Sequence, residues 1–438
     1  MRLAPILMTD QLITYELENG LRVYLKEIHT APIISHWIWY HVGSRNEQPG
    51  NTGISHWVEH LQFKGTEKFP SNKLDRLISR LGGHWNAFTH MDWTTYFETL
   101  PAKDLDIALE LEADRMVNSQ YDPDEVELER TVVISEREGA ENSPMFMLGE
   151  AVHLAALPSH PYRYEVGGLK EDLYRISRDE LFDHYRHYYQ PANANICISG
   201  DFNAEEVLKK IQAYYEHIPS KPNMPLILPN EPELENEQQV VVRGPGETTY
   251  LEVAYRAPEA CSKDFFGFTI LNSLMSGPAS LNMFGSGGVS NKTSRLYQAL
   301  VEEELAVAVR GHLSATIDPY LYTINFIIHP MHKPEEVIRA YDDQIQALQD
   351  HLVPADEIAR AVKQAKALFA YGSENITNQA FWMGYANAFA NYDWYTHYVD
   401  SLSEVTPTEV QRIAQKYLNP NFRVVGTYLP GSSQEALN

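Results

Sequence analysis

His56-Trp57-Val58-Glu59-His60 is the stretch of this 438-residue sequence that decides most about its fold and chemistry. Residues four apart lie on one face of an α-helix, so the two histidines can bind one ion while the glutamate lies beside it. Ile54, Val58 and Leu61 recur with helical spacing, which predicts a helix whose apolar face lies opposite the three polar residues. Ser55 is a possible N-cap. Two histidines on a polar face can also be simply solvated, and so short a motif also arises by chance.

A third metal ligand is the next requirement, because a catalytic zinc site combines three protein ligands with an open position. Glu129 and Glu136 are seven residues apart in a helix-like run, with Val132 and Val133 between them. This spacing places both carboxylates nearly on one helical face. Carboxylates flanked by valines are expected to face inward. A run of charges usually forms a solvated face, and Glu136 taken alone is equally compatible with that alternative.

The residues around these motifs form a wider pattern. It comprises residues 53–66, then Glu136, 76 positions after His60, and also residues 43–47, 82–89, 189–193 and 200–201. In this combination the chain resembles the inverted-motif zinc peptidases of the pitrilysin and insulinase clan, peptidase family M16. More narrowly it is similar to the short-chain branch that includes the mitochondrial processing peptidase and its bacterial relatives.

The resemblance implies a metal site with assigned roles. His56, His60 and Glu136 would bind one zinc ion, and Glu59 would be the general base. Zinc polarises the peptide carbonyl and acidifies water, and a nearby carboxylate can carry the proton to the leaving amine. Glu129 would lie near the metal and support one of its ligands.

The resemblance also implies a place for the substrate. Asn86, Ala87, Phe88 and Thr89 would form an edge strand to which a peptide adds itself as a further strand. Taken alone, Asn86 is also typical of a turn after Gly82 and Gly83.

Composition limits the class of protein. At 438 residues and 44% hydrophobic content, the chain should form two or more domains. Cys197 and Cys261 are too few for a disulfide framework, so we expect a reducing compartment and a cytoplasmic location. Residues 1–10 lack the apolar stretch of a signal peptide, and no run of about 18 apolar residues predicts a membrane span.

The net charge of -24 arises from 59 acidic and 35 basic residues, without a visible cluster of lysine or arginine. This argues against nucleic acid as a partner. The charge fits an acidic chamber that favours basic peptides, as in the processing peptidases, and it fits solubility alone.

A repeat divides the sequence into two halves. Glu180 and Glu409 are 229 residues apart, as are Pro191 and Pro420, within similar helix, turn and strand patterns, which indicates a duplicated domain.

The segment between the halves, residues 219–238, is rich in proline and acidic residues and predicts a stiff, exposed linker. We therefore expect an α+β fold with a zinc-binding domain at 1–218 and a homologous domain without a metal site at 239–438. Each would have an antiparallel-rich sheet with helices on one side.

Local patterns also predict individual elements. Residues 21–25 and 32–42 are strand-like, whereas residues 105–117 and 337–351 have helical periodicity.

The second half departs from the family in one respect. Complete members carry an arginine and a tyrosine after the segment that corresponds to residues 294–297, and these stabilise the oxyanion. Here the positions hold Leu300 or Val301 and Val307. Arg310 lies three residues further on, where a regular strand would project it differently. Tyr297 matches an apolar helix position and is expected in the core.

An intact metal motif beside a missing oxyanion pair leads to the main hypothesis. The chain would be the zinc-bearing subunit of a peptidase whose paralogous partner supplies the arginine and tyrosine, as a heterodimer or heterotetramer. Two alternatives stay open: a non-catalytic, zinc-retaining structural subunit of a larger assembly, and a zinc hydrolase acting on a small molecule.

Overall fold

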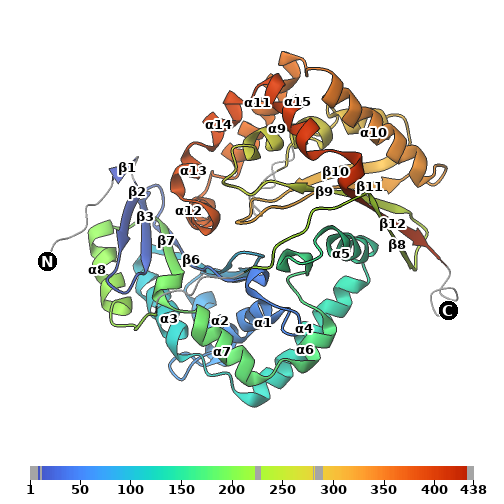
Figure 1. Cartoon of the computed structure of the whole chain (residues 1–438). Coiled ribbons are helices and arrows are strands. Elements are labelled where there is room, and N and C mark those ends of the chain that lie inside the picture. Colours follow the sequence, from blue (N-terminus) through green and yellow to red (C-terminus); the bar gives the residue numbers. More distant parts are fainter. Residues whose placement is uncertain (1–7, 10–11, 222–227, 280, 282–289, 432–438) are drawn as a thin grey trace. The chain divides into compact units, whose positions relative to one another are not determined.

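The computed structural model describes residues 8–9, 12–221, 228–279, 281 and 290–431 (Figure 1). Its contacts divide the chain into two compact units. Unit 1 comprises Met1–Arg137, Tyr164–Leu228 and Ser373–Tyr392, and unit 2 comprises Glu138–Arg163, Pro229–Gly372 and Asp393–Asn438, each within the described residues.

Unit 1 contains a seven-stranded sheet. Its order is β1 (Met8–Thr9), β2 (Leu12–Glu16), β3 (Arg22–Glu27), β7 (Ala194–Gly200), β4 (Ile33–Tyr40), β6 (Thr94–Pro101) and β5 (His84–Thr89). The β3–β7 pair is parallel and the other pairs are antiparallel. β5 therefore forms one edge of the described sheet.

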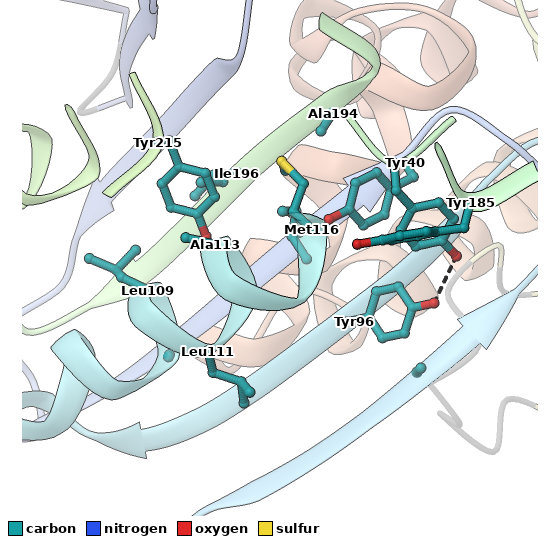
Figure 2. Packing of buried hydrophobic residues seen from close by; sticks show 14 of the residues in the cluster. Tyr40, Tyr96, Leu109, Leu111, Ala113, Met116, Tyr185, Ala194, Ile196 and Tyr215 are labelled. Carbon is teal, nitrogen blue, oxygen red and sulfur yellow. Dashed lines mark hydrogen bonds between the residues drawn. The ribbon is translucent and has the colours of Figure 1, made fainter. Parts of the chain in front are cut away.

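Helices cover this sheet and build the core of unit 1. They are α1 (Ile54–Leu61), α2 (Ser71–Arg80), α3 (Leu105–Asn118), α4 (Pro123–Glu141), α6 (Lys170–Arg175), α7 (Arg178–Tyr188), α8 (Ala204–Tyr215) and α12 (Ile376–Phe389), with α4 entering unit 2 from Glu138 on. Figure 2 shows Met116 of α3 packed near Tyr40 and Ile196 of the sheet. The hydroxyl groups of Tyr96 and Tyr189 lie 2.8 Å apart, and the dashed line from the labelled Tyr96 in Figure 2 marks this hydrogen bond. The core thus fixes β6 and the end of α7, two elements that flank α1.

Unit 2 repeats this arrangement with five strands. Their order is β10 (Ala306–Leu313), β11 (Tyr320–Ile328), β9 (Tyr250–Ala257), β12 (Arg423–Pro430) and β8 (Gln238–Gly244). The β12–β8 pair is parallel and the others are antiparallel. The helices are α5 (Pro144–Ala156), α9 (Phe265–Ser276), α10 (Pro334–Asp350), α11 (Ala355–Tyr371), α13 (Tyr392–Thr396), α14 (Tyr398–Glu404) and α15 (Pro407–Tyr417).

The duplication is visible at the helix caps. Ser177 caps α7 by accepting the amide of Glu180, and Thr406 caps α15 by accepting the amide of Glu409. Serine and threonine are favoured N-caps because their side-chain oxygen accepts an otherwise unpaired amide. The expected two-domain α+β fold is confirmed, with the same strand order in both sheets from β3 to β5 and from β8 to β10.

Each sheet also receives a helix from the other half of the sequence. α12 packs on β4 and β7 of unit 1, and α5 packs on β8, β9 and β12 of unit 2. Gly384 of α12 lies so close to Trp39 that a β-carbon would overlap the indole ring. The helices are consequently not confined to one side of each sheet. The compact units also differ from the predicted division at 1–218 and 239–438. α5 belongs to unit 2 and α12 to unit 1, because each helix packs on a sheet built mainly from the other half of the sequence.

Part of the predicted linker packs against unit 2. Residues 222–227 lie outside the described residues. Further on, Glu231 accepts the amide of Ser159 at 3.0 Å and pairs with Arg256 at 3.0 Å, and Leu234 is buried. From Glu231 on, the segment is therefore exposed only in part: Glu231 and Leu234 pack within unit 2, whereas Pro232, Glu233, Glu235 and Asn236 are exposed.

Candidate metal centre

The start of α1 depends on a glycine and a distant carboxylate. Gly53 precedes the helix with φ of 85°, and a β-carbon there would press on the carbonyl oxygen of Gly167, so glycine fits best. Glu47 accepts the amides of Gly53 and Ser55 at 2.8 and 2.9 Å. The sequence allowed Ser55 as the N-cap, but Gly53 holds that position. Ser55 is a buried helix residue whose hydroxyl lies 3.3 Å from Nε2 of His184.

α1 and α4 bring the three expected ligands together. The Nε2 atoms of His56 and His60 lie 3.3 Å apart. Oε2 of Glu136 on α4 lies 3.5 Å from Nε2 of His60 and 4.0 Å from Nε2 of His56. One donor atom from each residue thus falls within 4.8 Å of the others. Two imidazoles and one carboxylate form a donor set suited to zinc, with three protein ligands and room for a fourth, so these residues fit the implied metal.

Glu129 holds the second histidine from α4. Its Oε1 lies 2.8 Å from Nδ1 of His60, and its Oε2 contacts the ammonium of Lys64. A hydrogen bond from Nδ1–H to the carboxylate leaves Nε2 unprotonated and able to bind a metal. Only 7% of the Glu129 side chain is exposed, so this contact lies in a protected position.

Glu59 is the buried carboxylate of the group. Although Glu59 belongs to the polar side of the helical pattern, it is buried beside the end of β5. Its Oε2 accepts a hydrogen bond of 2.6 Å from the hydroxyl of Thr89. Within the described residues the carboxylate of Glu59 has no other hydrogen bond, so Oε1 is the oxygen left to exchange a proton.

The environment shifts the pKa values of these groups in different directions. Burial, together with the neighbouring His60, lowers the pKa of His56 to about 4, so His56 is neutral at pH 7. Burial alone would lower the pKa of His60, but its hydrogen bond to Glu129 and nearby carboxylates raise it. Metal binding at His60 therefore competes with a proton. Burial raises the pKa of Glu59, against the hydrogen bond from Thr89, which moves this carboxyl towards the range useful for a general base.

The inward orientation expected for both carboxylates of α4 is only half right. Glu129 is buried, whereas 51% of the Glu136 side chain is exposed. Val133 is buried but Val132 is 42% exposed. The α1-facing side of α4 therefore runs from a closed position at Glu129 to an open one at Glu136, and a ligand at Glu136 stays accessible.

The expected docking residues lie on the edge strand β5. Asn86 is exposed, Ala87 is buried, and Phe88 and Thr89 are partly buried. The amide of Ala87 donates to Oδ1 of Asn86 at 2.9 Å, a local contact of the kind that shields an unpaired strand edge. Because Thr89 also donates a hydrogen bond to Glu59, β5 ends directly beside the candidate metal centre.

The positions of the missing oxyanion pair lie in unit 2. Leu300 is buried and Val307 is 56% exposed at the start of β10. A bulge between Ala306 and Ala308 shifts the register of β10, so Val307 and Arg310 are both exposed. Hence the expectation that Arg310 projects away from the side of Val307 does not hold, because the extra residue breaks the alternation. Tyr297 is partly buried and lies on a short π-helical segment, Tyr297–Val301.

Three supporting contacts were not predicted from the sequence. Glu47 binds the start of α1, Lys64 binds Glu129, and Thr89 binds Glu59. All three residues lie within stretches that carry the family resemblance. Nothing in their spacing shows the contacts that they make, which connect positions up to 65 residues apart.

Two features bear on the environment of the chain. Cys197 is buried and Cys261 is exposed. Within the described residues, no helix is long and apolar enough to cross a membrane. Residues 1–7 and 10 of the N-terminal segment lie outside the described part.

Comparison with known proteins gives a consistent picture. Residues 22–168 match the model described as "Insulinase (Peptidase family M16)", and residues 175–365 match "Peptidase M16 inactive domain". The zinc protease PqqE of Helicobacter pylori is 27% identical over 413 residues, 92% of this chain and 89% of the relative. A crystal structure of a protease from Helicobacter pylori superposes with a TM-score of 0.88 at 25% identity, covering 96% of this chain and 99% of the other. Cytochrome b-c1 complex subunit 1 of Bos taurus is 30% identical over 200 residues, 46% of this chain and 42% of that protein.

Proposed function

Because the chain belongs to the insulinase family of peptidases, family M16, we propose that it is a zinc-dependent endopeptidase subunit that holds one zinc ion per chain. The observation that carries the proposal is the group of three donor atoms from His56, His60 and Glu136 within 4.8 Å of one another. Glu59 lies on the same helical turn as His60. A site with ligands alone would not need this buried carboxylate.

Each residue of the group has a distinct task in the proposal. Zinc, when bound, supplies Lewis acidity, which polarises a peptide carbonyl and makes water a stronger acid. His56, His60 and Glu136 would hold the ion. Glu59 accepts a proton at Oε1 and returns it to the leaving amine, while Thr89 keeps Oε2 in place. The raised pKa of Glu59 supports this task, because a base of moderate strength can both accept and release the proton.

The substrate class follows from β5. A peptide that pairs with this edge strand would take up the outward-facing backbone groups of alternate residues in the stretch Asn86, Ala87, Phe88 and Thr89. The side chain of Asn86 would then leave the amide of Ala87 and bond to the peptide. Since β5 ends at Thr89, the peptide backbone would be led towards Glu59.

A partner would complete the reaction. The positions at which complete members carry an arginine and a tyrosine hold Leu300 or Val301 and Val307, and such apolar side chains cannot donate a hydrogen bond to an oxyanion. We therefore place these donors on a paralogous subunit, in a heterodimer or heterotetramer. The similarity of 200 residues of the chain to a subunit of the cytochrome b-c1 complex supports this, because a related chain occurs in an assembly.

That same similarity favours a second candidate, a non-catalytic subunit that retains zinc in a larger assembly. The buried Glu59 counts against it, because a structural site has no use for a general base. A cytoplasmic location stays a prediction from the two cysteines.

The test is to purify the chain together with the proteins that bind it, and to measure zinc content and peptide cleavage on the same samples. We expect one zinc per chain, slow cleavage by the chain alone and fast cleavage with a paralogue. Equal cleavage rates with and without the paralogue would contradict the division of labour. Full zinc content without cleavage by any combination would favour the structural role.

A further inference from the structure

Lys64 occupies a position next to the metal centre that the proposed reaction does not use. The 3₁₀ segment Gln62–Lys64 continues directly from α1, so Lys64 lies four residues after His60 along one helical run. Residues with this spacing share a face. Both side chains therefore reach towards α4, and both meet the same residue there, Glu129.

The two oxygens of Glu129 are divided between these partners. Oε1 forms a hydrogen bond of 2.8 Å with Nδ1 of His60, and Oε2 forms an ion pair with the ammonium of Lys64. Lys64 has one other carboxylate nearby, Oε2 of Glu125 at 4.0 Å, which is 42% exposed. The Glu129 side chain is nearly closed off from solvent, so water could not fully replace the lysine as the partner of Oε2.

This arrangement links the two helices that supply the metal ligands. His60 and Lys64 belong to the α1 run, Glu129 belongs to α4, and Glu136 follows on the same side of α4 two turns later. Two charge-assisted contacts on one carboxylate restrict both its rotation and the spacing of the helices. The orientation of His60 and the approach of Glu136 therefore depend on the same carboxylate.

We propose that Lys64 is a positioning residue of the metal centre. By holding Oε2 of Glu129, it keeps Oε1 on Nδ1 of His60 and so keeps Nε2 of His60 turned towards His56 and Glu136. The inference rests on the proposed function in so far as the site binds zinc. Lys64 touches neither metal nor substrate in this role and acts only through Glu129.

The test measures zinc affinity by competition with a chromophoric chelator, and the visible spectrum of the cobalt-loaded protein. Lys64→Met should weaken zinc binding about 10- to 100-fold, the usual effect of losing a partner behind a metal ligand, and should alter the cobalt spectrum. Lys64→Arg should restore most of the affinity, because a guanidinium can also donate to Oε2. Lys68→Met is the matched control. Lys68 pairs with Glu110 at a distance of 2.6 Å and contacts none of the metal ligands, so this variant should bind zinc as tightly as the wild type.

A double-mutant cycle distinguishes positioning from a general structural role. Glu129→Gln should weaken zinc binding at least as much as Lys64→Met, and the double variant should bind no more weakly than Glu129→Gln alone. If the fold-losses in zinc affinity of the two single variants multiply in the double variant, Lys64 acts independently of Glu129 and the inference is overturned. Wild-type zinc affinity in Lys64→Met would overturn it as well. If Lys64→Met does not fold, the cycle is run with Lys64→Gln. A wild-type protein that binds no zinc would instead contradict the proposed function itself.

Discussion

α1 of unit 1 and α9 of unit 2 follow the second strand of their repeats and occupy the same place in the element order. α1 keeps one partly open face, with two half-buried histidines, whereas nearly every residue of α9, from Phe265 to Ser276, is buried. The edge strands differ likewise. β5 is regular and ends at the metal centre, whereas β10 carries a bulge.

The comparison shows which part of the duplicated fold carries chemistry. The sheets keep their strand order and their single parallel pair between β3 and β7 or β8 and β12. The helix after β4 or β9 changes from a ligand-bearing segment to a core segment. Backbone pairing thus maintains the fold, and the face of one helix decides whether a unit carries a candidate set of metal ligands. The following predictions test this contrast.

Replacement of the base should give the largest effect. Glu59→Gln should reduce turnover by about 10²- to 10⁴-fold, the range for loss of a general base, while zinc content stays at the wild-type level. Steady-state kinetics with metal analysis measures both quantities. Glu303→Gln in unit 2, where the residue is exposed, is the control and should leave turnover unchanged. Unchanged turnover in Glu59→Gln would remove Glu59 from the reaction.

A buried ion pair in unit 1 and a partly exposed ion pair in unit 2 should differ in their contribution to stability. Arg115 is buried in unit 1, donates to Glu112 at 2.7 Å and lies 4.3 Å from the ring centre of Tyr96. Arg115→Met leaves buried carboxylates without a cation and should lower the free energy of unfolding by about 3–5 kcal/mol. Arg412 pairs with Asp264 in unit 2 but is 45% exposed, so Arg412→Met should cost about 1 kcal/mol or less. Urea denaturation distinguishes the two, and similar losses would contradict the contrast.

An added methyl group should have different effects at the contact of α12 with the sheet of unit 1 and at the contact of α5 with the sheet of unit 2. Gly384→Ala places a β-carbon into the rigid indole of Trp39 and should destabilise by about 1–3 kcal/mol. Gly426→Ala on β12 would meet methyl groups of Val152 and Leu148 on α5, with a smaller overlap than the one between Gly384→Ala and the indole ring, so the loss should be smaller. Calorimetry of both variants gives the comparison. A larger loss for Gly426→Ala would show that α5 is packed more rigidly than α12.

Acid should weaken unit 1 through a histidine behind α1. Burial, with a contribution from His187, lowers the pKa of His184 to about 3. Since the unfolded chain binds this proton first, near pH 6.5, stability falls as the pH drops from 6.5 towards 3, by about 1.4 kcal/mol per pH unit. In unit 2, the buried His160 lies 3.3 Å from Oδ2 of Asp318.

The measurement for His184 is the urea midpoint at pH 7.0 and 5.5, in the wild type and in His184→Gln. The variant should lose less stability on acidification, because glutamine does not titrate. Equal losses in both proteins would show that His184 stays unprotonated or paired in the acid range.

Local elements could be predicted from the sequence because their signals are local. The strand pattern at residues 21–25 corresponds to β3 (Arg22–Glu27), and the helical pattern at 105–117 corresponds to α3 (Leu105–Asn118). Periodicity reports which side of an element is apolar, but it does not report which element covers that side. The sheets on which α5 and α12 pack were therefore not predictable from the residues of these two helices.

The metal centre shows the same limit. His56 and His60 could be paired from helical spacing, and Glu136 from the family pattern, and the structure brings their donor atoms together. The helical pattern places Glu59 opposite the apolar face of α1 but does not show that it is buried, which it is because Thr89 at the end of β5 contacts it. Contacts between segments that are distant in sequence decide such details, and a single sequence carries no direct record of them.

The exchange of α5 and α12 has a consequence for synthesis on the ribosome. The sheet of unit 1 gains its last covering helix only at Phe389, long after Gly200, the end of its last strand, has been made. Until then Trp37 and Trp39, which pack near Phe381 of α12, lack their native cover. A growing chain of this length should therefore depend on protection from chaperones. Genetic separation of the halves should yield fragments that refold only when they are produced together.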